Sequence, residues 1–174
     1  MKTVRFGIVG VGNMGSGHVK SLGEGHISRA ELTAVCDIKP ERLERVRAEY
    51  GDKLSYFTDY HDMLNSGKID VVIIATPHYL HPVIAQDAFR AKVNVISEKP
   101  AGVYTKAVRE MNEAAAKSGV QFGIMFNQRT NPVYKKAREM VQSGELGQLK
   151  RLVWIITDWY RTQAYYDSGD WRAT

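Results

Sequence analysis

Cysteine is almost absent from the chain, because Cys36 is the only one among 174 residues. A single cysteine excludes an internal disulfide and suits a reducing cytosol, so we expect a cytoplasmic protein. Cys36 stands in an apolar run, which favours a buried structural thiol over a nucleophile. Long hydrophobic runs are missing too: the longest purely aliphatic stretch, residues 71–75, is far too short to span a membrane. Met1 and Lys2 lead straight into a strand pattern, without the apolar segment of a signal peptide.

The chain has no polybasic tail, although its formal net charge is +5. Basic groups outnumber acidic ones by 16 to 14 in residues 1–125 and by 8 to 5 in residues 126–174, so the excess is spread out. A nucleic-acid surface needs a basic stripe interleaved with aromatic residues. The arginines of residues 41–49 alternate instead with glutamates, which is typical of a solvated helix face. We therefore expect no nucleic-acid partner.

Clustered metal ligands are also missing. His78 and His81 could pair on a metal ion, but no cysteine or acidic cluster near them completes a ligand set. We therefore expect no metal site.

The opening of the chain has the pattern of a dinucleotide-binding turn. An apolar, β-branched run at residues 4–9 is followed at once by G-x-G-x-x-G, with Gly10, Gly12 and Gly15, and a second apolar run ends at Asp37. The glycines allow a tight turn, a close approach of the backbone to a pyrophosphate, and close helix packing. The acidic residue would bind the adenosine ribose hydroxyls. The predicted contacts here are Gly10, Gly12, Asn13, Met14, Gly15 and Asp37. The alternative is a glycine-rich turn without a ligand.

Strand and helix patterns alternate over residues 1–125. We expect strands at residues 4–9, 32–36, 55–58, 71–75, 93–97 and 121–125. We expect helices at residues 14–22, 40–50 and 60–64, one around residues 80–88, and one from a Thr105 cap to Gly119. Short connections in this order predict a Rossmann-type, doubly wound parallel α/β sheet.

The pattern changes after Phe126. A helix is expected at residues 132–142, then a long strand at residues 149–159, then an aromatic and polar ending. Three aromatic residues with no further strand to pair with look unfinished. We therefore expect residues 126–174 to begin a second, truncated α+β domain.

Together these motifs resemble the N-terminal half of the Gfo/Idh/MocA oxidoreductases, the glucose–fructose oxidoreductase and inositol dehydrogenase-like family. The segments that carry the resemblance are Gly10–Gly15, Asp37, Ala75-Thr76-Pro77 with His81, Glu98-Lys99-Pro100 and Asn127-Gln128-Arg129. The resemblance implies a Rossmann domain and then a large, mostly antiparallel domain that supplies substrate contacts, further catalytic groups and the interface of a homo-oligomer. It also implies that the complete protein is about twice as long.

Three of these motifs follow predicted parallel strands. Thr76-Pro77, Glu98-Lys99 and Asn127 each stand at the carboxyl end of one. Ligands of open parallel sheets bind beyond those ends, so we expect the motifs to converge on one crevice with the glycine loop.

Lys99 is the catalytic candidate. Alcohol oxidation needs hydride transfer to a nicotinamide and loss of the hydroxyl proton, and the protein must manage that proton. An ammonium group stabilises a developing alkoxide, and a desolvated lysine can have its pKa lowered towards neutral. The resemblance also places this lysine at the reacting hydroxyl. The alternative is a surface lysine in extended backbone before a proline.

The other candidates rest on the resemblance. It implies that Glu98 contacts the nicotinamide ribose and that Asn127 holds the nicotinamide half of the cofactor, with Thr76 and Pro77 beside them. His81 would orient the same region; the alternative is a structural histidine. Arg129 is a further candidate substrate contact. Asp170, Trp171 and Arg172 would form a substrate loop on their own chemistry, because Trp and Arg suit stacking on and hydrogen-bonding to a polar ring.

We therefore predict a nicotinamide-dependent dehydrogenase acting on a sugar, cyclitol or similar polyol. NAD is favoured over NADP because Asp37 would face the ribose 2′ position, although Lys39 and Arg42 soften this preference. Residues 1–174 are expected to bind the cofactor without turnover. Two other hypotheses stay open: a glycoside hydrolase that uses bound NAD for transient oxidation, and a non-catalytic dinucleotide-binding module.

Overall fold

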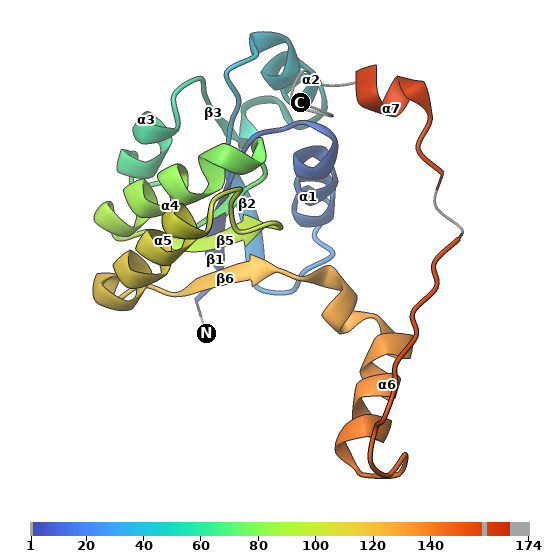
Figure 1. Ribbon diagram of the computed structural model, residues 1–174. Helices are drawn as coiled ribbons and strands as arrows, with labels where there is room; N and C mark the ends of the chain where they lie inside the picture. Colours follow the sequence, from blue (N-terminus) through green and yellow to red (C-terminus); the bar gives the residue numbers. More distant parts are fainter. Residues whose placement is uncertain (1, 158–159, 168–174) are drawn as a thin grey trace. The chain divides into compact units, whose positions relative to one another are not determined.

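The computed structural model describes residues 2–157 and 160–167 (Figure 1). The chain divides into two compact units, Met1–Met125 and Phe126–Thr174. No helix among the described residues is long and apolar enough to cross a membrane.

The first unit is built on a sheet of six parallel strands. They are β1 (Val4–Val9), β2 (Ala30–Cys36), β3 (Ser55–Phe57), β4 (Val71–Ile74), β5 (Asn94–Glu98) and β6 (Phe122–Met125). Their spatial order is β3-β2-β1-β4-β5-β6 and every neighbouring pair is parallel. The order reverses between β1 and β4, which is the Rossmann arrangement and confirms the predicted fold class. Ligands of such sheets bind at this reversal.

Five helices connect the strands of the first unit. They are α1 (Asn13–Gly23), α2 (Pro40–Tyr50), α3 (Tyr60–Asn65), α4 (His81–Arg90) and α5 (Thr105–Ser118), with short 3₁₀ turns η1 (Gly51–Lys53) and η2 (His78–Leu80). Asp59 caps α3 by accepting the His61 N–H at 2.8 Å, and Gly119 ends α5 in the left-handed region at φ 75°. The expectation that Thr105 caps α5 is wrong: extended Tyr104 is the N-cap, and Thr105 is already helical.

Helices cover both faces of the sheet, so the first unit has two apolar layers (Figure 1). On one face Ile8 and Ile73 pack with residues of α1 and α2. On the other face Val72 and Ile74 pack with residues of α3, α4 and α5. Successive β4 residues therefore serve opposite layers, which is why a buried parallel strand is a continuous apolar run.

The second unit contains η3 (Asn127–Thr130), α6 (Pro132–Gln142) and α7 (Gln163–Asp167). Helix α6 has the predicted bounds, with Pro132 in its first turn and Asn131 capping it by accepting the Val133 N–H at 3.0 Å. The strand expected at residues 149–159 is not found: residues 149–157 form none, and residues 158–159 lie outside the described part. A strand needs a hydrogen-bonded neighbour, and none of the described segments pairs with this one.

Candidate functional site

The loop after β1 is shaped by two glycines that the protein's own packing requires. Gly10 has φ +89°, and its N–H donates to the Cys36 carbonyl at 2.8 Å. A Cβ on Gly10 would lie 2.8 Å from the Ala75 oxygen, and one on Gly15 would lie 1.8 Å from the Gly10 oxygen. No side chain fits at such distances, so these two glycines would be needed even in a turn without a ligand.

Gly12 is different, because neither backbone strain nor packing demands a glycine there. Its φ is −72°, which any residue can adopt, and the nearest atom to a Cβ would be Nη1 of Arg42 at 3.7 Å. Gly12 is the N-cap of α1, which has no side-chain cap and no acidic residue in its first turn. The first N–H groups of that helix therefore have no capping side chain among the residues that the structure describes, and the bare backbone leaves room for an anion to approach them. A dinucleotide pyrophosphate fits this arrangement.

Asp37 follows β2 and is buried beneath the loop, with 4% of its surface exposed. Its Oδ2 accepts the Val11 N–H at 2.9 Å, and its Oδ1 accepts the Lys39 N–H at 2.9 Å. Nη1 of Arg42 lies 3.2 Å from Oδ2. The carboxylate therefore ties the phosphate loop to the start of α2, a role that the sequence analysis missed. Its contact with ribose hydroxyls stays a prediction.

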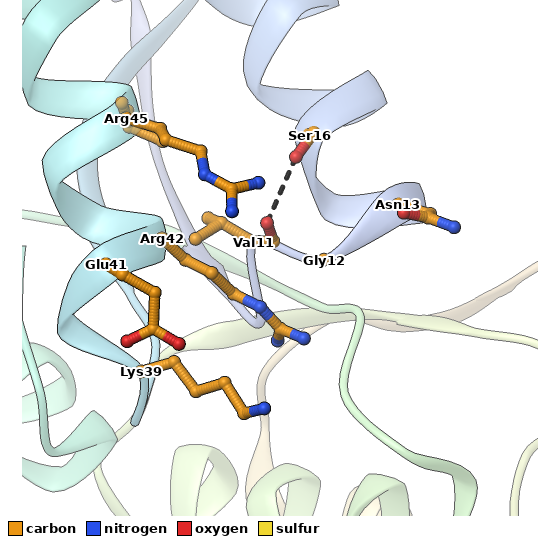
Figure 2. A pocket seen from close by; sticks show the side chains of 9 residues that line it. Val11, Gly12, Asn13, Ser16, Lys39, Glu41, Arg42 and Arg45 are labelled. Atoms are coloured by element: carbon orange, nitrogen blue, oxygen red, sulfur yellow. Dashed lines mark hydrogen bonds between the residues drawn. The ribbon is translucent and has the colours of Figure 1, made fainter. Parts of the chain in front are cut away.

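A cavity of about 290 Å³ opens beside this loop (Figure 2). That volume is near the lower end of small-molecule pockets, which suits one portion of a dinucleotide. The cavity is lined by Val11, Gly12, Asn13, Ser16, Lys39, Glu41, Arg42, Arg45 and Val46. Three of these side chains are cationic and one is acidic, so the cavity favours an anion. The arginines of α2 were predicted to lie on a solvated face: Arg45 and Arg47 are exposed, and Arg42 and Arg45 also line this cavity.

At the end of β5, Glu98 is buried and held from two sides. Its Oε1 lies 2.8 Å from Nε2 of His18 on α1, and its Oε2 accepts the Lys99 N–H at 3.2 Å. The Lys99 residue itself is exposed. The buried carboxylate thus fixes the backbone from which the exposed lysine projects. Sequence analysis missed His18, although it lies three residues after Gly15 and so on the helix face that packs on the sheet.

Two loops at the same edge are joined by His81, whose side chain is fully buried. Its Nδ1 lies 2.8 Å from the Pro100 oxygen and its Nε2 lies 2.9 Å from the Thr76 oxygen. A ring with no exposed surface braces the loops after β4 and β5, as a structural histidine would, and its role in orienting the cofactor region stays a prediction. The Thr76 hydroxyl is buried without a hydrogen-bond partner among the described residues, and a bound cofactor would supply one. Pro77, next in the chain, is half-buried.

Cys36 lies at the end of β2 and is buried. Burial away from water raises the pKa of its thiol to about 12. The thiolate is therefore scarce at neutral pH, which agrees with a structural rather than a nucleophilic role.

The remaining candidates belong to the second unit. Asn127 and Arg129 lie in η3, where the Arg129 guanidinium stands over the Phe126 ring at 5.1 Å. Asp170, Trp171 and Arg172 fall outside the described residues. Their predicted roles at the substrate and the nicotinamide stay predictions.

Sequence relatives match most of the chain. Inositol 2-dehydrogenase of Salmonella typhimurium is 35% identical over 149 residues, which are 84% of this chain and 44% of that protein. The rhizopine catabolism protein MocA of Rhizobium meliloti is 32% identical over 150 residues, 86% of this chain and 45% of that protein. The chain thus spans less than half the length of these curated relatives.

Solved structures match the fold. Scyllo-inositol dehydrogenase of Lactobacillus casei, with bound NAD(H) and scyllo-inositol, has a TM-score of 0.79 at 31% identity and covers 84% of this chain and 43% of its own. The WlbA dehydrogenase of Bordetella pertussis, in complex with NADH and UDP-GlcNAcA, has a TM-score of 0.86 at 30% identity and covers 98% of this chain and 51% of its own. Residues 4–126 match the model of the oxidoreductase family with an NAD-binding Rossmann fold. The chain therefore belongs to the Gfo/Idh/MocA family of oxidoreductases.

Proposed function

We propose that this chain is the cofactor-binding part of an NAD(H)-dependent dehydrogenase that oxidises a hydroxyl group of a cyclitol, a sugar or a sugar derivative. The observation that carries the proposal is the exposed Lys99, set beside a buried and anchored Glu98 at the sheet edge that holds the Gly10–Gly15 loop. Relatives named as inositol dehydrogenases and a neighbour with a bound nucleotide sugar support this substrate class.

The chain's own residues divide the binding of a dinucleotide between them. The N-terminus of α1 and the bare backbone at Gly12 receive the pyrophosphate. Asp37 would bind the adenosine ribose, and the Thr76 hydroxyl, which has no hydrogen-bond partner among the described residues, would contact the nicotinamide half from the loop after β4. When bound, the nicotinamide supplies the hydride acceptor.

Lys99 manages the proton of the reacting hydroxyl. Its ammonium form donates a hydrogen bond to the substrate oxygen and stabilises alkoxide charge, and its neutral form accepts the hydroxyl proton. Glu98 accepts the Lys99 N–H and contacts the His18 ring, so it orients the lysine backbone. It does not itself exchange a proton with the substrate. A fixed backbone matters because a small displacement of a reacting group costs a large part of the rate.

The test is Lys99→Met in the full-length protein. Turnover of the best substrate in a cyclitol and sugar panel should fall by about 10²–10⁴-fold, the range for a lost acid–base group, whereas NAD affinity should change little. Lys106→Met, at an exposed position in the first turn of α5, is the matched control and should leave both unchanged. Near-normal turnover of Lys99→Met would remove the lysine from the proton step. Release of a phenol from an aryl glycoside without net NADH would instead indicate glycoside hydrolysis.

We further propose that residues 1–174 alone bind NAD but oxidise no polyol at a measurable rate. The chain spans less than half of its curated relatives, and its apolar residues 149–157 are exposed. NAD at about 100 times its dissociation constant should add about 2.7 kcal/mol to the free energy of unfolding. A thermal melt with and without NAD, beside an NADH absorbance assay, tests both parts. Strong NADH formation contradicts the second part, and no thermal shift contradicts the first.

A further inference from the structure

The buried carboxylate of Glu98 has its contacts on two different elements. His18 on α1 provides one, with its Nε2 2.8 Å from Oε1, and the Lys99 N–H provides the other, 3.2 Å from Oε2. A carboxylate only accepts hydrogen bonds, so the proton of the first contact is assigned to Nε2. The side chains of His18 and Glu98 are only 19% and 7% exposed. Water therefore has little access to take the place of either partner.

The hold of the carboxylate on the lysine depends on the histidine. Among the described residues, no side chain other than His18 donates a hydrogen bond to Glu98. A buried carboxylate that loses a partner is costly. It would lower that cost by rotating toward water or by taking up a proton, and either change alters the acceptor that the Lys99 N–H uses. Glu98 therefore fixes the lysine backbone only while His18 fixes Glu98.

Helix α1 is also the element whose N-terminus receives the pyrophosphate in the proposed function. His18 lies in the second turn of this helix. The helix packs closely on its loop, because a Cβ on Gly15 would lie 1.8 Å from the Gly10 oxygen. One helix thus places both the phosphates of the cofactor and the carboxylate that holds Lys99.

We infer that His18 is a positioning residue of the dehydrogenase reaction, which holds Lys99 in register with the cofactor by way of Glu98. The inference rests on the proposed function and adds a residue to it. In this role His18 need not contact the substrate. Its loss should slow the chemical step and spare cofactor binding, because a small displacement between reacting groups costs a large part of the rate.

The kinetic test is His18→Met in the full-length protein, measured beside Lys99→Met. The kcat should fall by about 10²-fold, as for a reacting group misplaced by about 1 Å, and the Kd of NAD⁺ should change by less than about threefold. His18→Gln should recover most of the lost kcat, because its amide carries an N–H donor as many bonds from the backbone as Nε2. His26→Met is the matched control and should change neither quantity, since His26 is an exposed histidine that lies 3.5 Å from Glu24.

Hydrogen exchange measures the same link without any turnover. In this chain, the Lys99 amide should exchange about tenfold faster in His18→Met than in the parent, which corresponds to the loss of one hydrogen bond. The Ala75 N–H, which donates to the Val9 oxygen at 2.8 Å just after β4, should exchange at an unchanged rate. Faster exchange at both amides would show that the substitution loosens the whole unit, and it would overturn the positioning role.

The contrary kinetic results are distinct from one another. Normal kcat in His18→Met with a large loss in Lys99→Met refutes the positioning role and leaves the proposed function standing. Equal losses of kcat and NAD⁺ affinity would make His18 a cofactor contact instead. A His18→Gln variant as slow as His18→Met would show that packing of the ring matters rather than its hydrogen bond. Normal turnover in Lys99→Met would contradict the proposed function itself.

Discussion

Residues 1–125 bury an apolar core on both faces of their sheet, whereas the apolar side chains of residues 149–157 in the second unit are exposed. Ile8 and Met63 are fully buried, but Leu152 and Ile155 are 81% and 78% exposed. Helix α6 still forms, because its hydrogen bonds and its Asn131 cap are local. Residues 149–157 have a strand-like pattern and form no strand, because strand hydrogen bonds need a partner from elsewhere. The comparison separates structure that neighbouring residues specify from structure that depends on distant ones.

The largest effect should come from Gly15→Ala. The new methyl group would lie 1.8 Å from the Gly10 oxygen, and neither backbone can move without separating α1 from the sheet. We expect the free energy of unfolding of the first unit to fall by more than about 3 kcal/mol, above the usual cost of overpacking. Urea denaturation followed by circular dichroism measures it.

Gly17→Ala on the same helix is the control. No atom lies within 4 Å of a Cβ at Gly17, and an exposed helical Gly→Ala change stabilises by about 0.5–1 kcal/mol. If Gly15→Ala behaved like Gly17→Ala, the first unit would be less tightly packed than described, and the contrast with the second unit would weaken.

A matched pair of leucines tests the contrast directly. Leu22 on α1 is 4% exposed and Leu152 is 81% exposed. Leu22→Ala should lower the free energy of unfolding by about 2–5 kcal/mol, because it removes buried methyl groups and leaves a cavity. Leu152→Ala should change it by less than about 0.5 kcal/mol. Equal losses in chemical denaturation would show that Leu152 is packed in solution and would break the comparison.

The same contrast explains how far the sequence predicts the fold. The apolar run at residues 71–75 was predicted as a strand and forms β4. Its residues pack into both buried layers, so its continuous apolar pattern matches its position in the sheet. Asp59 and Gly119 each act within one turn of chain, and the end of α5 at Gly119 was predicted correctly. The predicted N-cap of α5, Thr105, was wrong by one residue. The extended residue before the helix is Tyr104, and no side chain there makes a capping hydrogen bond that the sequence could have signalled. The prediction of a strand at residues 149–159 was wrong for residues 149–157, because the alternation of apolar residues does not show whether a neighbouring strand is present.

Among the site residues, those with local roles were predicted from the sequence, and those whose partners lie far away in the chain were missed. The glycines of the loop were identified from spacing alone, since each has its own steric or binding role. His18 and Arg45 were missed because their importance depends on what lies across from them: the Glu98 carboxylate for one and the cavity for the other. The two contacts of His81 were not predicted for the same reason, because its Pro100 and Thr76 partners lie in other loops.

The smallest expected effect concerns the ion pair that joins β1 to the start of β4. Arg5 donates to Asp70 from Nη2 at 2.8 Å, from Nε at 3.1 Å and from its backbone N–H at 2.9 Å. These hydrogen bonds hold the pKa of the Asp70 carboxyl well below its usual range. A lowered pKa in the folded state stabilises the fold at neutral pH. That contribution begins to fall as pH drops below about 4, where the unfolded carboxyl takes up its proton, and it is gone once the pH has passed the lowered pKa of the folded state.

Asp70→Asn should therefore lower the urea midpoint at pH 7 and make its decline between about pH 5 and pH 3 shallower than in the parent chain. Asp52→Asn, at an exposed position in η1, should leave both the midpoint and the slope unchanged. Helix α6 provides the internal reference, because its Asn131 cap is an amide that does not titrate. Acid should therefore lower the stability of the first unit and leave the cap of α6 unchanged. The difference in stability between the two regions should become smaller. Parallel pH profiles for Asp70→Asn and the parent chain would show that the pair contributes nothing to acid sensitivity.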